Sequence, residues 1–189
     1  MFWLAYISQK KEIRTLLFLY VKLLNYAVKF KKQNNKVAII MGSRSDNSTM
    51  IDCEKILKTL KIKYQVLIVS AHRTPKRMFE FADNASKNGF AVIIAAAGGA
   101  AHLPGMVASL STLPVIGVPI ESKTLKGLDS LLSISQMPKG VPVATMAING
   151  SFNAGLLAAA IIGTFDEKVK TNLDKWRRLQ TQSVKKKLK

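Results

Sequence analysis

Both histidines of the chain follow an apolar run and stand close before a proline. The first lies in "VLIVSAHRTP", residues 66–75, and the second in "AVIIAAAGGAAHLPG", residues 91–105. An imidazole changes its charge near neutral pH, because its unperturbed pKa is about 6.5. His72 therefore has the side chain that general acid–base chemistry needs, and Arg73 beside it can hold a phosphate or carboxylate. Taken alone, both are also consistent with a structural histidine and a surface arginine.

A second stretch rich in hydrogen-bonding groups is "MGSRSDNST", residues 41–49. The hydroxyls of Ser43 and Ser45, with the free N–H groups of a helix start, would bind a phosphate. Asp46 would accept hydrogen bonds from ribose hydroxyls. The same residue types also form N-caps and turns. The stretch is neither a Walker loop nor a dinucleotide fingerprint, because the required glycines are missing.

The third stretch, "AAAGGAAHLPG" at residues 95–105, is made almost entirely of small residues. Gly98 and Gly99 allow the backbone to approach a ligand closely. A wall of this kind suits a small, poorly hydrated species beside a reacting centre. Tight packing of a helix on a sheet would need the same small residues, so both interpretations stay open here.

From Lys36 onward, short apolar runs alternate with segments of helical period. The expected strands are residues 37–41, 64–69, 91–97, 114–120 and 141–148. The expected helices are residues 49–60, 75–89, 103–111, 125–136, 153–163 and 166–180. This alternation predicts an α/β fold, a three-layer doubly wound (flavodoxin-like) parallel sheet of about five strands.

Ligands of such sheets bind outside the carboxyl ends of the strands. All three chemical stretches follow expected strands, so they should meet at one edge of the sheet. This placement favours a binding or catalytic site over the separate structural interpretations.

The formal net charge of +18 is concentrated at the two ends of the chain. Residues 1–36 carry eight Lys and Arg against one acidic residue, and residues 175–189 carry seven against none. The intervening residues have fourteen against ten. Charged ends are more often solvated than used to read nucleic acid. We therefore expect no nucleic-acid partner, with a basic tail at residues 183–189.

The single cysteine, Cys53, excludes an intrachain disulfide and indicates a reducing, cytoplasmic location. It lies on an apolar helical face and is expected in the core. No Cys/His cluster suggests zinc, so no metal and no cofactor are expected.

Residues 1–35 differ from the rest and are expected to be an extension of unknown role. "TLLFLYVKLLNYAV" is apolar but interrupted by Lys22, and is short for a transmembrane span. Three interpretations compete: an amphipathic arm on the domain or on a membrane surface, a poor export signal, or an extension irrelevant to function. We favour the last, with no membrane partner, because residues 36–182 look complete as a domain.

The motifs "MGSRSD", "VSAHRTP", "AAAGGAAHLPGM", "GVPI" and "SISQMPKGVPVATMAI" occur together and in order. With them, residues 36–182 resemble the class I (bacterial-type) N5-carboxyaminoimidazole ribonucleotide mutases of de novo purine biosynthesis. The resemblance covers about four-fifths of the chain. It implies an isomerase that moves a carboxylate from the exocyclic nitrogen to C4 of aminoimidazole ribonucleotide. The family route passes through CO2 held in the site and needs no ATP, metal or biotin.

The resemblance also implies roles for individual residues. His72 would be the general acid/base, and Ser43, Asp46 and Arg73 would bind the nucleotide. The residues that would line the same site are Ser45, Ser70, Ala71, Gly98, Gly99, His102 and Leu103. Family members often have Trp where this chain has Asn47, which removes a packing contact but no chemical group.

The family further implies a homo-octamer and a functional link to the ATP-dependent synthetase that makes the carbamate substrate. Three other functions remain open. One is a direct carboxylase acting on aminoimidazole ribonucleotide and CO2. The second is a nucleotide-binding sensor that would not need His72. The third is a nucleic-acid or membrane-surface protein that binds through its basic ends.

Overall fold

The computed structural model describes residues 13–22 and 35–187. The chain divides into two compact units, Met1–Gln33 and Asn34–Lys189. In the first unit, residues 13–22 are helical. The rest of the expected N-terminal extension, and the last two residues of the expected basic tail, lie outside the described residues.

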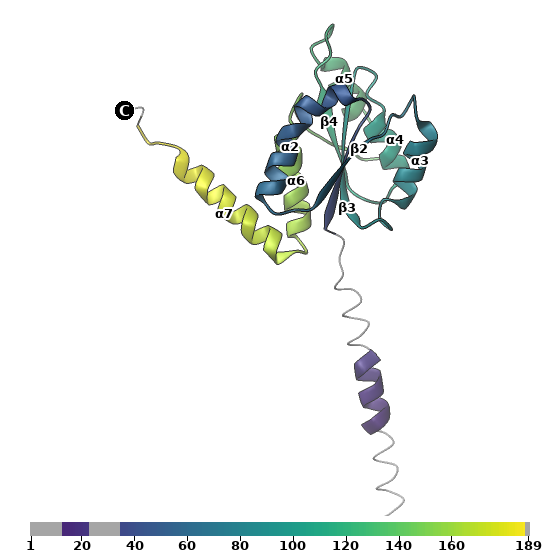
Figure 1. The fold of residues 1–189 in the computed structure, drawn as a ribbon, viewed down its shortest axis with the longest axis vertical. Helices are drawn as coiled ribbons and strands as arrows, with labels where there is room; N and C mark the ends of the chain where they lie inside the picture. The colour runs from purple at the N-terminus through teal and green to yellow at the C-terminus, as the bar shows by residue number, and fades with distance from the viewer. Residues whose placement is uncertain (1–12, 23–34, 188–189) are drawn as a thin grey trace, which may run out of the picture. The chain divides into compact units, whose positions relative to one another are not determined.

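The second unit is built on five parallel strands in the order β2-β1-β3-β4-β5 (Figure 1). This order and the all-parallel pairing confirm the flavodoxin-like prediction. The strands are β1 (Lys36–Met41), β2 (Tyr64–Ile68), β3 (Phe90–Gly98), β4 (Val115–Ile120) and β5 (Ala144–Thr145).

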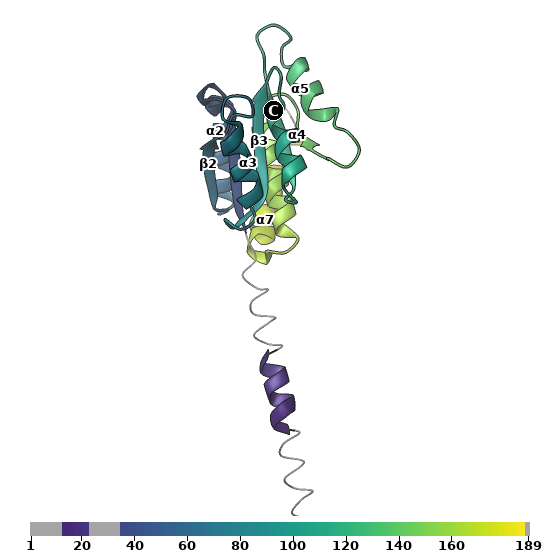
Figure 2. The same ribbon diagram turned by 90° about the vertical axis from the view of Figure 1, so that its right-hand side faces the viewer.

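Helices cover both faces of this sheet (Figures 1 and 2). One face is packed by α2 (Asn47–Thr59), α6 (Ser151–Gly163) and α7 (Glu167–Ser183). The other face is packed by α3 (Pro75–Asn84), α4 (Leu103–Leu110) and α5 (Leu128–Ser135). A short 3₁₀ helix, η1 (Arg44–Asp46), precedes α2.

The central strand β1 shows how one apolar run builds two cores. Val37, Ile39 and Met41 point to the α2/α6 side, while Ala38 and Ile40 point to the α3/α4 side. All five are fully buried. Alternate side chains of a strand leave opposite faces, so a strand buried on both sides is apolar throughout.

On the α2/α6 side, Cys53 is buried against α6, as expected for a core residue. The ring of Trp176 in α7 lies 5.8 Å from that of Phe152 in α6 and attaches the last helix to the domain.

The fifth strand is much shorter than the eight residues expected at 141–148. Only Ala144 and Thr145 pair with β4 as strand residues. Pro142 has no N–H to donate, and β5 lies at the sheet edge, where one side lacks a partner strand. Beyond it, the N–H of Met146 still donates to the Gly117 carbonyl at 2.9 Å.

Two helices are also shorter than their expected ranges. The helix expected at 75–89 ends at Asn84 and is followed by turns up to Gly89, whose φ is +83°. The helix expected at 125–136 begins only at Leu128, because Lys126 and Gly127 have positive φ angles of 52° and 87°. Helical periodicity continued into both turns and concealed these boundaries.

Candidate active site

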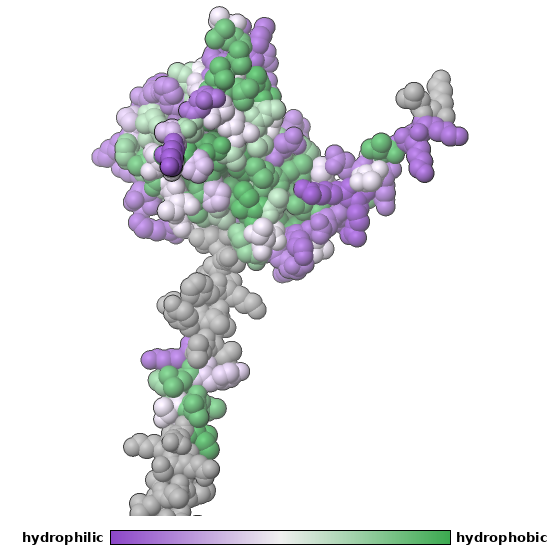
Figure 3. Space-filling model, turned by 180° about the vertical axis from the view of Figure 1, so that it is seen from behind, coloured by the Kyte–Doolittle hydropathy of each residue, from purple (hydrophilic) through white to green (hydrophobic). Residues whose placement is uncertain are grey.

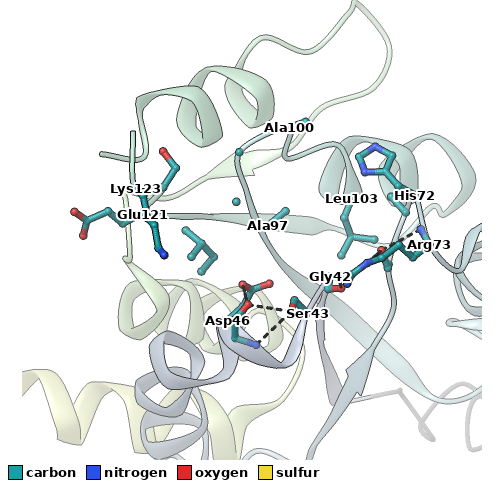
Figure 4. A pocket seen from close by; sticks show the side chains of 17 residues that line it. Gly42, Ser43, Asp46, His72, Arg73, Ala97, Ala100, Leu103, Glu121 and Lys123 are labelled. Atoms are coloured by element: carbon teal, nitrogen blue, oxygen red, sulfur yellow. Dashed lines mark hydrogen bonds between the residues drawn. The ribbon is translucent and has the colours of Figure 1, made fainter. Parts of the chain in front are cut away.

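A cavity of about 710 Å³ opens at the carboxyl ends of β1 to β4 (Figure 4). All the expected site residues except His102 line it. The remaining lining residues are Gly42, Ala97, Ala100, Ile120, Glu121, Ser122 and Lys123. The three chemical stretches of the sequence therefore meet at one place, as the strand-end rule predicts.

The loop after β1 supplies hydroxyls and a carboxylate to the cavity. The Ser43 hydroxyl caps η1 by accepting from the backbone N–H of Ser45 at 3.4 Å. The Ser45 hydroxyl lies 2.9 Å from Ser43 Oγ and 3.1 Å from Asp46 Oδ1. Capping and ligand binding are thus not exclusive here, since a hydroxyl both donates and accepts.

Asp46 is half-buried in the wall of the cavity. Burial raises the pKa of its carboxyl, while the Ser45 hydroxyl, the Ser43 backbone and the charge of Arg73 act in the opposite direction. A carboxylate that has lost part of its water is a strong acceptor for ligand hydroxyls.

The loop after β2 directs the side chain of Arg73 toward the carboxyl end of β1. Its Nη2 donates to the Gly42 carbonyl at 2.6 Å, and its Nε contacts Ser70 Oγ at 3.4 Å. The Ser70 hydroxyl also accepts from the Arg73 backbone N–H at 3.2 Å. Thr74 closes the turn, because its hydroxyl bridges the Ser70 N–H and carbonyl at 2.9 and 3.0 Å. The guanidinium is held in place with donors left for an anion.

The two histidines meet although they are thirty positions apart. His72 Nε2 lies 2.9 Å from His102 Nδ1, and the rings are nearly perpendicular at 85°. A contact of this length needs a proton on one nitrogen and a lone pair on the other. Only His72 lines the cavity, so His102 can fix the tautomer and orientation of the ring that does.

The small-residue loop after β3 forms the cavity wall beside the histidines. Gly99 has a φ of +66°, a backbone conformation that residues other than glycine rarely adopt. Its N–H donates to Ser130 Oγ at 2.8 Å, and the Ser130 hydroxyl donates to the Ile120 carbonyl at 2.7 Å. Ser130 is fully buried in α5. One hydroxyl therefore ties the ends of β3 and β4 together.

The loop after β4 was not among the expected site residues, yet Glu121, Ser122 and Lys123 line the cavity. Figure 4 shows Glu121 and Lys123 on the opposite side of the cavity from His72 and Arg73. Asn149, whose φ is +58°, holds Glu121 by donating to its carboxylate at 3.2 Å. The strand-end rule applied to the fourth strand would have found this loop. Ser130 had no comparable signal, because its role depends on two distant backbone groups.

Among the described residues, no group of three or more His, Cys, Asp or Glu is placed to hold a metal ion. The helices within the described ranges are all too short or too polar to cross a membrane.

Comparison with known proteins decides the family. The family model described as AIR carboxylase matches residues 36–183. The chain belongs to the AIR carboxylase family. Relatives named N5-carboxyaminoimidazole ribonucleotide mutase include one from Haemophilus influenzae, 55% identical over 79% of this chain and 92% of its own. The relative from Thermotoga maritima is 64% identical over 68% of this chain and 75% of its own.

A solved structure supports the same assignment at the level of the fold. The crystal structure of Treponema denticola PurE superposes with a TM-score of 0.72 at 28% identity, and covers 78% of this chain and 92% of its own. The Bacillus subtilis mutase is 58% identical over 78% of this chain and 93% of its own.

Proposed function

We propose that this chain is an isomerase of purine biosynthesis that converts N5-carboxyaminoimidazole ribonucleotide to its C4-carboxylated isomer. The observation that carries the proposal is the single cavity at the strand ends. It combines a hydroxyl and guanidinium anion site, a half-buried carboxylate and a paired histidine. The mutases at 52–64% identity support this substrate.

The ribonucleotide has groups that match these parts of the cavity. Its 5′-phosphate fits the Ser43 and Ser45 hydroxyls with Arg73. Its ribose hydroxyls fit the carboxylate of Asp46. The base then lies toward His72 and the small-residue wall of Gly98 and Gly99.

His72 moves the protons. As the bond between the exocyclic nitrogen and the carboxylate carbon breaks, the carbamate releases CO2 and the nitrogen takes a proton from His72. The C4 carbon then attacks CO2 and forms the new C–C bond. His72 finally removes the proton that C4 carried. The imidazole of His72 thus regains the proton it gave up, and the reaction is a net isomerisation.

The small apolar residues around Gly98 and Gly99 keep the released CO2 beside C4 because their side chains offer no polar groups that would draw water to it. A turnover reaction in labelled bicarbonate tests this sealing. Label should enter the product slowly relative to turnover, and rapid incorporation would exclude retention of CO2.

The decisive assay follows the ultraviolet spectrum of freshly made N5-carboxyaminoimidazole ribonucleotide mixed with purified protein. The mixture contains no ATP, no metal and no added bicarbonate. Appearance of the C4-carboxylated product supports the mutase. No product from this substrate, in a sample that is folded by circular dichroism, would reject it.

The direct carboxylase is the second candidate, because the matching family model bears that description. It uses the same cavity with free CO2 in place of the carbamate. Product from aminoimidazole ribonucleotide and concentrated bicarbonate alone would favour it over the mutase.

Three further expectations belong to this proposal. The labile carbamate must come from an enzyme that carboxylates the exocyclic nitrogen with ATP. The protein acts in the cytoplasm, where that substrate is made, and it assembles as a homo-octamer. Sedimentation equilibrium measures the assembly state, and a monomer at micromolar concentration would reject the octamer.

A further inference from the structure

The helix at residues 13–22 exposes large apolar side chains around most of its circumference. Successive residues of a helix are separated by about 100°, which places Arg14, Thr15 and Lys22 in one polar sector together with Phe18. The remaining sectors carry Ile13, Leu16, Leu17, Leu19, Tyr20 and Val21, each 47–66% exposed. Figure 3 shows apolar side chains on the surface of this helix.

A helix of this kind needs an apolar environment. Isolated helices shorter than about 12–15 residues are marginal in water, and the described helical run has ten. It is also too short to cross a bilayer. A wide apolar face with cations on the polar sector is instead the pattern of a helix that lies in a membrane interface.

A basic surface of the second unit supplies an independent observation. A hollow of about 440 Å³ is lined by Lys36, Lys58, Lys61 and Lys63 with Ile62 and Tyr64. No acidic residue lines it, and none of the four lysines forms a salt bridge within the described residues. We call these four residues the lysine edge.

The lysine edge lies at the amino ends of β1 and β2, opposite the strand ends that form the active-site cavity. Thirteen residues separate the helix from Lys36, and such a segment spans at most roughly 45 Å. A segment of this length allows the helix and the lysine edge to bind the same surface, and within the second unit the cavity opens at the other end of the strands.

We propose that helix 13–22 and the lysine edge bind together to an anionic lipid surface. The apolar face enters the interface, and the lysines meet the headgroups, where each cation adds to the attraction. Nucleic acid matches the charge but offers no partner for the apolar face. This replaces the expectation that residues 1–35 are irrelevant, and it is independent of the proposed function.

Co-sedimentation of the full chain with vesicles tests the proposal. Vesicles of phosphatidylcholine alone are compared with vesicles containing phosphatidylglycerol, at low and high NaCl. The protein should sediment with the anionic vesicles and dissociate as salt rises. A double substitution, Leu16→Glu with Leu17→Glu, should weaken binding at least about tenfold, because it places charges in the apolar face.

Two matched variants make the result specific. Phe18→Ser removes an aromatic ring from the polar sector and should change binding by less than about twofold. The triple variant Lys58→Gln, Lys61→Gln and Lys63→Gln should lose at least about tenfold on anionic vesicles and little on neutral ones. An unchanged circular dichroism spectrum of the full chain shows that each variant is folded.

Three outcomes would overturn the proposal. The first is no sedimentation with either vesicle. The second is binding that ignores lipid charge. The third is a double Leu variant that alters the sedimentation coefficient in free solution but not vesicle binding, which would assign the helix to a second copy of the chain.

Discussion

The contact between His72 and His102 places a ring nitrogen of one histidine 2.9 Å from a ring nitrogen of the other. If His72 carries the protons of the reaction, His72→Asn should lower kcat by about 10²–10⁴-fold, since that is the usual contribution of a general acid/base. Substrate binding, measured by calorimetry, should remain, because Arg73 and the serines are intact.

His102→Asn is the matched variant. It should lower kcat less than His72→Asn and shift the pH–rate profile, because the second ring acts through the first. Equal losses with an unchanged profile would contradict this division of roles.

Asp46 carries a conflict between stability and binding. Its pKa is raised by burial in the folded state, so the folded protein binds that proton at a higher pH than the unfolded chain does. The ionised carboxylate therefore destabilises the fold at neutral pH, and the effect is relieved as pH falls through the raised pKa.

Asp46→Asn should raise the urea midpoint at pH 7 slightly and raise KM strongly, with the gain in stability fading toward acidic pH. Asp52→Asn, an exposed helix position paired with Lys55 at 2.9 Å, is the control and should change neither. A variant at Asp46 that is less stable than the parent at pH 7 would refute the argument.

The sequence identifies most of the residues around this cavity because they follow strands directly, and parallel strands end at one edge. The pairing of His72 with His102 could not be read in this way. Their loops are adjacent because β1 lies between β2 and β3, and the length of the contact depends on how each loop turns.

At the scale of elements, α5 controls the shape of the small-residue wall through Ser130. Ser130→Ala should destabilise the protein by about 1–3 kcal/mol, because the Gly99 N–H and the Ile120 carbonyl lose a buried partner. It should also raise KM, since Gly99 lines the cavity. Ser133→Ala is the control, because the Ser133 hydroxyl lies at the longer distance of 3.3 Å from the Gly99 carbonyl. Equal effects of the two variants in urea titrations would contradict the role of Ser130.

The contact between α2 and α6 depends on Gly155. A Cβ at this position would lie 2.5 Å from Ile56 Cγ2 and 3.3 Å from the Cys53 carbonyl. Gly155→Ala should therefore destabilise the fold by about 1–3 kcal/mol through overpacking, despite a gain in helix propensity of about 1 kcal/mol.

Gly163→Ala at the end of the same helix is the matched control. Its Cβ would find its nearest neighbour at 3.4 Å, near Lys170, so thermal unfolding should show no loss. A Gly155→Ala variant as stable as this control would show that α2 moves away without cost.

Element types were predictable where apolar runs were buried on both faces, as in β1 and β3. The prediction was weakest for β5, where periodicity alone suggested eight residues and two were found. At an edge strand, pairing is decided by which N–H groups find a carbonyl, and an apolar pattern does not carry that information.

At the scale of the whole molecule, the formal net charge is +18. Within residues 13–22 and 35–187 the salt bridges are exposed and join residues three or four positions apart. Repulsion between cations should therefore dominate the effect of salt.

Raising NaCl from 10 to 200 mM should increase the melting temperature by about 2–4 °C, which corresponds to about 1 kcal/mol for a chain of this size. Choline chloride should act equally, because screening depends on ionic strength and not on the cation. A melting temperature that falls with salt would show net attraction instead.

The buried thiol of Cys53 can report local opening of the core. It is the only cysteine of the chain, it is fully buried beside Gly155, and burial raises the pKa of its thiol to about 12. A thiol reagent can modify it only after α2 separates from α6 and the sulfur reaches water. The rate of modification under native conditions thus reports on the opening of this half of the core, without any introduced probe.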